Sequence, residues 1–271
     1  MSNLPDSNLP EDFSDNAIEV TNLVKQFRVR HQGGSLKGAL LNRGRSAPRT
    51  DTPTILNDLS FTVPRGQTLA VIGRNGSGKS TLLGTLARIY KPTSGTVGLH
   101  GPKNSPARVA PLLALGAGFH PDLSGLDNIL FYGAILGLSP KEIRAKQEAI
   151  LDFAELEDKA DTALYGWNDG AKLRLGFAIA VHTDPDILLV DEVLAVGDEA
   201  FQNKCYRLIG DLQRQGKTIL FVSHDLAVVE RVADRVLWLD NGVIRLDGNT
   251  PEVLAAYREN AKRRNRQDEQ D

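Results

Sequence analysis

A run of apolar residues followed directly by a glycine-rich turn constrains the fold of this chain more than any other feature. The run, Thr68 to Ile72, lacks the alternation of a half-buried strand and is typical of a strand covered on both faces. Two further runs, 187–190 and 218–222, have the same character, and a helical pattern follows each of them. Strand, loop and helix repeated in this order predict an open α/β sheet.

The turn after the first run has the composition of a phosphate-binding loop. Residues 73–81 match the pattern G-x-x-x-x-G-K-[ST] between a buried strand and a helix. Glycines let successive backbone N–H groups converge on phosphate oxygens, and a helix N-terminus adds its dipole. We expect Lys79 to reach the β- and γ-phosphates, Ser80 to bind Mg²⁺, and Thr81 to lie near the α-phosphate. The predicted nucleotide-binding residues of the loop are Gly73, Arg74, Asn75, Gly76, Ser77, Gly78, Lys79, Ser80 and Thr81.

Acidic residues end the second buried run at the sheet edge where α/β proteins place their chemistry. Asp191 is predicted to hold Mg²⁺, and Glu192 to polarise the water that attacks the terminal phosphate. His224 follows the third run, so it can lie at the same edge and contact the γ-phosphate. Glu192 and His224 are therefore the predicted catalytic residues.

Composition excludes several other classes of protein. The chain has 271 residues, a formal net charge of −2 and one cysteine, Cys205. The charge gives no indication of nucleic-acid binding, and a single cysteine indicates a small buried residue rather than a disulfide or metal site. No apolar run approaches the length of a membrane span, and the polar N-terminus does not resemble a signal peptide. Any association with a membrane is therefore expected to come through a partner.

The remaining pattern predicts how the domain is organised. Residues 1–16 are expected to form a disordered arm, and residues 261–271 a charged tail. Residues from about 120 to 182 are predicted to be mostly helical and to interrupt the alternation of strands and helices. A hairpin is predicted over 235–246, with its turn at Asn241 and Gly242. The Gly-, Arg- and Ser-rich segment 31–52 is predicted to be a long loop.

Together these motifs resemble the ABC-type ATPases. The segment 170–180 has the place of that family's signature helix, and Asp198 that of its D-loop aspartate. Phe27 corresponds to the aromatic residue that stacks on adenine. The resemblance covers residues 17–260 and implies a P-loop NTPase core with a mixed sheet and an inserted α-helical subdomain. It also implies a head-to-tail dimer, here a homodimer, that encloses two ATP molecules.

Two segments, 115–129 and 191–198, resemble the subgroup that exports O-antigen, capsule or teichoic-acid polymers. This likeness implies a peripheral protein at the cytoplasmic face of the inner membrane, where it drives an integral membrane permease. Three aromatic residues of the helical insertion are candidates either for contact with that permease or for the core of the insertion: Phe131, Tyr132 and Trp167.

The signature departs from the family pattern. Asn168 and Asp169 precede Gly170 where the family has a serine and a small residue, and a glutamine expected near residues 114–116 is absent. The signature has either drifted while hydrolysis persists, or the chain is a weakly or non-hydrolysing partner in a heteromeric transporter. A soluble ABC ATPase of translation or DNA repair is a third hypothesis. The single cassette, without a coiled-coil or zinc insertion, disfavours it.

Overall fold

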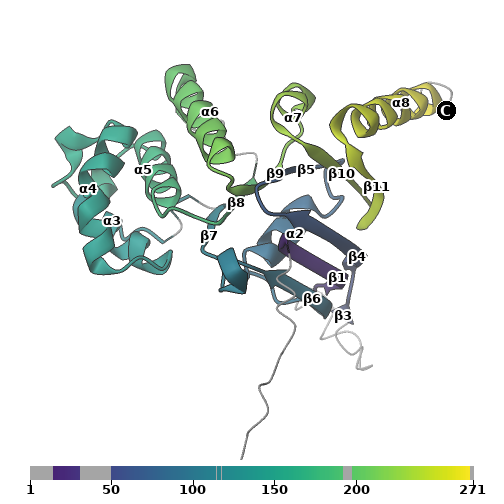
Figure 1. Ribbon diagram of the computed structural model, residues 1–271, viewed down its shortest axis with the longest axis horizontal. Coiled ribbons are helices and arrows are strands. Elements are labelled where there is room, and N and C mark those ends of the chain that lie inside the picture. The colour runs from purple at the N-terminus through teal and green to yellow at the C-terminus, as the bar shows by residue number, and fades with distance from the viewer. Residues whose placement is uncertain (1–14, 31–49, 114, 117, 192–196, 269–271) are drawn as a thin grey trace, which may run out of the picture.

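A six-stranded sheet forms the centre of the molecule (Figure 1). The computed structural model describes residues 15–30, 50–113, 115–116, 118–191 and 197–268. Five neighbouring strands of this sheet run parallel, and only β11 at one edge is antiparallel. In spatial order the strands are β11 (Val243–Asn249), β10 (Arg235–Asp240), β5 (Thr68–Ile72), β9 (Thr218–Val222), β8 (Ile187–Asp191) and β7 (Val109–Leu112).

A smaller antiparallel sheet lies beside the central one (Figure 1). Its middle strand, β1 (Asn16–Gln26), pairs with β4 (Thr54–Pro64) on one side and with β6 (Ser94–Leu99) on the other. The two-residue strands β2 (Val29–Arg30) and β3 (Thr50–Asp51) pair at the ends of the undescribed segment 31–49. Residues 1–14 of the predicted arm, which was expected to cover residues 1–16, lie outside the described residues. Asn16 begins β1.

Helices lie over one face of the central sheet and between the two sheets, and others form a separate lobe (Figure 1). The helices of the structure are α2 (Lys79–Leu86), α3 (Gly125–Ile135), α4 (Pro140–Ala154), α5 (Asp169–Val181), α6 (Glu199–Arg214), α7 (Leu226–Val232) and α8 (Thr250–Asp268). Three short 3₁₀ turns occupy Pro102–Asn104, Glu157–Lys159 and Leu164–Gly166. No described helix has both the length and the apolar character that crossing a membrane requires.

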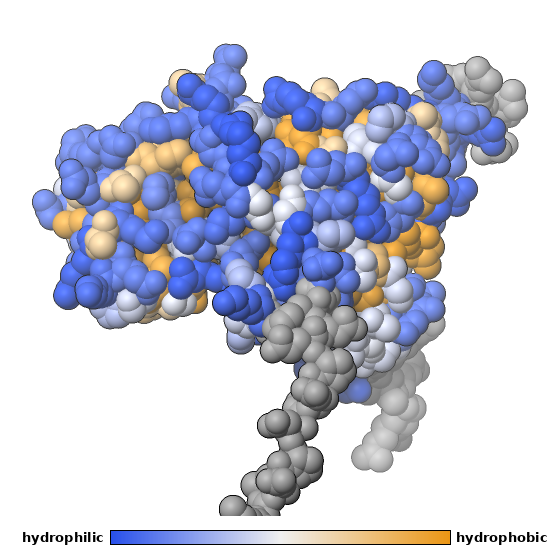
Figure 2. All heavy atoms as spheres, viewed as in Figure 1, coloured by the Kyte–Doolittle hydropathy of each residue, from blue (hydrophilic) through white to orange (hydrophobic). Residues whose placement is uncertain are grey.

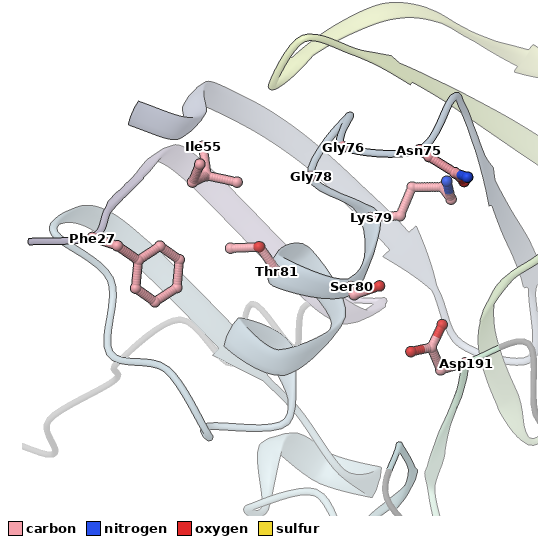
Figure 3. Close-up of a pocket in the computed structure, with 9 residues that line it drawn as sticks. All are labelled: Phe27, Ile55, Asn75, Gly76, Gly78, Lys79, Ser80, Thr81 and Asp191. Carbon is pink, nitrogen blue, oxygen red and sulfur yellow. The ribbon is translucent and has the colours of Figure 1, made fainter. Parts of the chain in front are cut away.

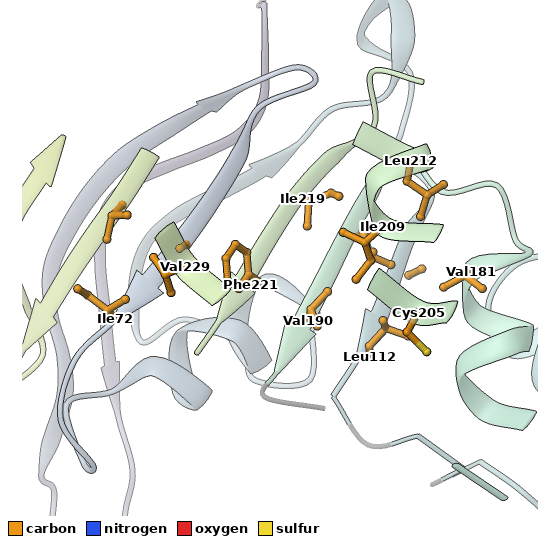
Figure 4. Packing of buried hydrophobic residues seen from close by; sticks show 14 of the residues in the cluster. Ile72, Leu112, Val181, Val190, Cys205, Ile209, Leu212, Ile219, Phe221 and Val229 are labelled. Atoms are coloured by element: carbon orange, nitrogen blue, oxygen red, sulfur yellow. The ribbon is translucent and has the colours of Figure 1, made fainter. Parts of the chain in front are cut away.

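Alternate residues of the parallel strands contribute to two separate cores, because successive side chains point to opposite faces of a sheet. On β5, Ala70 and Ile72 pack with helices α5 to α8, whereas Leu69 and Val71 pack with α2 and the antiparallel sheet. Figure 4 shows the first of these cores between the strands and the covering helices. This double burial explains why the strands of the parallel sheet are continuously apolar in sequence.

Cys205 lies within the first core, on α6. Removal from water raises the pKa of its thiol to about 12. The prediction that this cysteine is a small buried residue agrees with its position.

Helices α3, α4 and α5 form a lobe with its own apolar core, within the range predicted to be helical. Tyr132 and Trp167 are each 6% exposed and belong to this core, whereas Phe131 is 49% exposed. Of the three aromatic residues considered for contact with a permease, only Phe131 therefore remains at the surface. Figure 2 shows apolar side chains among polar ones on the left-hand lobe of the molecule.

The C-terminal hairpin forms one edge of the central sheet, and helix α8 packs against its two strands. The hairpin turns at Asn241 and Gly242, as the sequence predicted. Helix α8 extends to Asp268, and within it Arg264 donates a 3.1 Å hydrogen bond to the buried carboxylate of Asp240. Much of the segment predicted to be a charged tail is thus helical, and one of its arginines contacts the sheet.

Candidate nucleotide-binding site

The phosphate loop, residues 73–81, connects β5 to the first turn of α2. Gly73 lies against β10, where an added Cβ would come 2.1 Å from the carbonyl oxygen of Leu239. Gly78 has a φ of 107°, and a Cβ there would lie 3.0 Å from the carbonyl oxygen of Ile55. Close packing against backbone thus requires glycine at both positions.

Lys79 occupies the interior of this loop and is 7% exposed. Its ammonium group donates hydrogen bonds to the carbonyl oxygens of Gly73, at 2.8 Å, and Arg74, at 3.1 Å. A buried cation requires such partners because desolvation is costly. The two bonds also hold the loop curved around the position of the ammonium group.

Ser77 provides a test of whether the loop fits a ligand. Its side chain is 3% exposed, and its hydroxyl oxygen has no hydrogen-bond partner among the described residues. The Ser77 backbone is fixed, because Gly242 N–H donates to its carbonyl oxygen at 3.0 Å. Buried polar atoms are rarely left without a partner in native proteins. A buried hydroxyl in a glycine-lined loop therefore fits a site that accommodates phosphate oxygens.

The loop opens into a pocket of about 610 Å³ (Figure 3). Figure 3 shows Phe27 at one end of this pocket and Asp191 at the other, with the loop between them. The structure thus brings together three segments that the sequence analysis selected separately. The lining residues are Phe27, Ile55, Asn75, Gly76, Gly78, Lys79, Ser80, Thr81 and Asp191. Ile55, at the start of β4, was not predicted, since an apolar residue at a strand end carries no specific signal.

The carboxyl ends of β8 and β9 bring the predicted catalytic segments to one edge of the sheet. Asp191 is the last residue of β8 and pairs with Val222 of β9, two residues before His224. Figure 3 shows the Asp191 carboxylate turned toward the loop that carries Lys79 and Ser80. His224 is exposed beyond the end of β9. Glu192, the predicted catalytic base, lies outside the described residues.

The residues that depart from the signature pattern begin helix α5. Asn168 is the N-cap, and its side-chain oxygen accepts a 2.8 Å hydrogen bond from Ala171 N–H. Asp169 is the first helical residue, and its exposed carboxylate lies 3.8 Å from the ammonium group of Lys172. Acidic residues stabilise the first turn of a helix. Both substitutions therefore have a local structural role, and Asp169 has a cation beside it. Gly170 occupies the same turn.

Asp198, the predicted D-loop aspartate, is the N-cap of α6. Its carboxylate accepts a 2.9 Å hydrogen bond from Phe201 N–H. The residue therefore fixes the start of the helix that packs over β8 and β9. One described residue, Gly197, separates Asp198 from the undescribed segment 192–196.

Comparison with known proteins identifies the family. The model of the ABC transporter family matches residues 56–195, a range that contains the phosphate loop, α5 and Asp191. The chain belongs to the ABC transporter family. The predicted fold, a P-loop NTPase core of the ABC ATPase type, is confirmed by its likeness to a solved structure. That structure is a dimeric ATP-binding cassette in a post-hydrolysis state, bound to ADP and Pi. It aligns with a TM-score of 0.67 over 86% of this chain and 98% of its own, at 21% identity.

Curated relatives in the ABC transporter family include two named as export proteins. The chain is 45% identical over 93% of its length to the O-antigen export system ATP-binding protein RfbB of Myxococcus xanthus, of which it spans 57%. It is 41% identical over 89% of its length to the protein of the same name from Klebsiella pneumoniae, of which it spans 97%. These relatives confirm the resemblance to the polysaccharide-export subgroup that residues 115–129 and 191–198 suggested.

Proposed function

We propose that this ABC ATPase binds and hydrolyses ATP to drive export of a lipid-linked polysaccharide or teichoic-acid-like polymer. The observation that carries the proposal is the pocket in which Lys79, Ser80 and Asp191 meet around a glycine-lined loop. The polymer class rests on the two relatives named for O-antigen export and on the resemblance of residues 115–129 and 191–198 to the subgroup that exports O-antigen, capsule or teichoic-acid polymers. The proposed location is the cytoplasmic face of the cell membrane, where a permease subunit would carry the polymer.

Different residues of the pocket are proposed to bind different parts of the nucleotide. Lys79 and the backbone N–H groups of residues 73–81 are proposed to bind the phosphates, and Phe27 to stack on adenine. Ser80 and Asp191 would hold Mg²⁺, since hydroxyl and carboxylate oxygens are the ligands that this ion prefers. When bound, the ion would neutralise charge on the phosphate oxygens. Glu192 would orient the attacking water and take its proton, and His224 would donate a hydrogen bond to the γ-phosphate.

Two copies of the chain are proposed to close head to tail, so that each signature helix faces the phosphate loop of the other copy. Asn168, Asp169 and Gly170 would then approach the second nucleotide. Because the Asn168 oxygen already caps α5, its amide group is the part that can donate to a phosphate. Asp198 would lie at the same dimer interface. The altered signature suggests one alternative, a heterodimer with a second ATPase subunit.

The Glu192→Gln variant tests hydrolysis apart from binding. We expect ATP turnover to fall about 100-fold or more, because the amide cannot accept the proton of the attacking water. The affinity for ATP should stay near that of the unaltered chain. Glu199→Gln, an exposed glutamate in the first turn of α6, is the matched control and should turn over normally. Steady-state ATPase assays, with and without the permease, measure both variants.

Two results would count against these assignments. Turnover that survives Glu192→Gln would remove Glu192 as the catalytic base. Absence of turnover in the unaltered chain, both alone and with its permease, would support a non-hydrolysing partner subunit. In that case, replacing Asn168 with serine and Asp169 with glycine should restore activity if the altered signature is the cause.

A further inference from the structure

Tyr90 lies beside Phe27, although neither the motifs nor the spacing of the sequence connect the two residues. Their ring centroids are 5.3 Å apart, with the ring planes at 90°, which is the edge-to-face arrangement that aromatic pairs prefer. We propose that Tyr90 is a positioning residue that sets the plane of the Phe27 ring for stacking on the base of the nucleotide. This inference rests on the ATP site proposed above.

The Tyr90 ring packs against helix α2. The backbone N–H groups of Ile89 and Tyr90 both donate to the carbonyl oxygen of Gly84, at 2.9 and 3.1 Å. A Cβ added to Gly84 would lie 2.7 and 2.8 Å from two carbons of the Tyr90 ring. The ring therefore packs against a part of α2 that only glycine leaves open.

The same helix also carries the phosphate site, because Lys79 is in its first turn. Helix α2 consequently connects the phosphate end of the pocket with the ring that contacts Phe27. A base that stacks on Phe27 would be held at a defined distance from the phosphate loop. Such preorganisation increases affinity because less conformational freedom is lost when the ligand binds.

Lys25 links the two rings from the side of β1. Its ammonium group donates a 2.8 Å hydrogen bond to the carbonyl oxygen of Lys91, the residue after Tyr90. The same group lies 4.7 Å from the centroid of Phe27 and 5.8 Å from that of Tyr90. Both distances are within the range of a cation–π contact.

Phe27 needs these contacts because it follows the end of β1 and is only partly buried. Its backbone N–H donates to the carbonyl oxygen of Pro53 at 3.3 Å, which fixes the main chain but not the ring. Figure 3 shows the ring at the edge of the pocket, on the same side as Thr81 and Ile55. Without Tyr90, other rotamers of Phe27 would become accessible.

The test compares ligands with and without a base. Mg-ATP, Mg-ADP and inorganic tripolyphosphate are titrated calorimetrically into the unaltered chain and into Tyr90→Leu, Tyr90→Phe and Lys79→Ala. We expect Tyr90→Leu to weaken the binding of ATP and ADP about fivefold, given the strength of aromatic pairs. The affinity for tripolyphosphate should stay unchanged. Tyr90→Phe keeps the ring and should bind all three ligands normally. In the ATPase assay, Tyr90→Leu should raise KM for ATP with kcat unchanged.

A second variant covers the case in which Tyr90→Leu does not fold. Lys25→Met removes the ammonium group that contacts both rings and keeps most of the side-chain stem. It should weaken the binding of ATP about twofold, again without an effect on the binding of tripolyphosphate. A thermal unfolding scan of each variant establishes that it is folded before titration.

Three outcomes would overturn the inference. In the first, neither Tyr90→Leu nor Lys25→Met changes the affinity for ATP. In the second, the affinity for tripolyphosphate falls as much as the affinity for ATP, which would place the effect at the phosphate loop. Both leave the proposed function standing if the unaltered chain binds ATP and Lys79→Ala does not. The third, an unaltered chain without ATP binding, would overturn the proposed function and this inference together.

Discussion

Replacing Lys79 with alanine is expected to weaken Mg-ATP binding about 100-fold and to reduce turnover to background. Hydrogen bonds from charged donors contribute about 1.5–3 kcal/mol each, and the ammonium group is expected to make them to phosphate oxygens. In the structure this group already lies inside the loop, bonded to the carbonyl oxygens of Gly73 and Arg74. The variant therefore loses both the charge and the group around which the loop curves. Calorimetric titration and a steady-state ATPase assay measure the two effects.

Lys141→Ala is the matched control for this experiment. Lys141 is exposed on α4, in the helical lobe, and its removal should change neither affinity nor turnover. If the Lys79 variant bound Mg-ATP as tightly as the unaltered chain, the phosphate loop would not be the nucleotide site.

The second large effect concerns stability. Phe177 on α5 is fully buried between Phe153 of α4 and Phe201 of α6, with ring centroids 6.0 and 6.3 Å away. The residue thereby joins two helices of the lobe to the helix that follows the D-loop. Truncating a buried phenylalanine to alanine costs about 3–5 kcal/mol, through lost transfer energy and the cavity that remains. We expect Phe177→Ala to lower the free energy of unfolding by that amount, measured by urea denaturation.

Phe131→Ala provides the matched comparison, because Phe131 is 49% exposed on α3. Surface substitutions usually change stability by less than about 0.5 kcal/mol. Equal losses in the two variants would contradict the packing described here. Of the three aromatic residues considered for contact with a permease, Phe131 is the exposed one, so its loss could affect a permease without affecting the fold.

The features that could be predicted from the sequence are those encoded by neighbouring residues. Continuous apolar runs predicted β5, β8 and β9, because burial on both faces of a parallel sheet removes polar alternation. The phosphate loop is a contiguous motif, and the hairpin turn at Asn241 and Gly242 has a local signal. The expected polysaccharide-export resemblance also came from contiguous segments.

The features that could not be predicted depend on contacts between distant residues. The register of β6 on β1 pairs residues about 80 positions apart, and no local pattern specifies it. The charged residues after 260 predicted a solvated helix end and tail, and no local pattern indicated that Arg264 would reach the buried carboxylate of Asp240. Tyr90 was missed for the same reason, since only the fold brings it to Phe27.

The signature shows how a substitution can be judged differently in sequence and in structure. In sequence, Asn168 and Asp169 are departures from a pattern that contacts phosphate. In the structure, Asn168 caps α5 and Asp169 lies beside Lys172 in the first turn of that helix. The helix start is therefore preserved by residues suited to it.

Residues 73–81 are proposed to bind a nucleoside triphosphate together with Mg²⁺. A calorimetric titration of the purified chain with ATP, once with Mg²⁺ and once with a chelator, tests this proposal most directly. We expect saturable binding of one ATP per chain that weakens about tenfold or more without the ion, because the triphosphate charge is then less neutralised. Absence of saturable binding, or an affinity that does not respond to Mg²⁺, would contradict it.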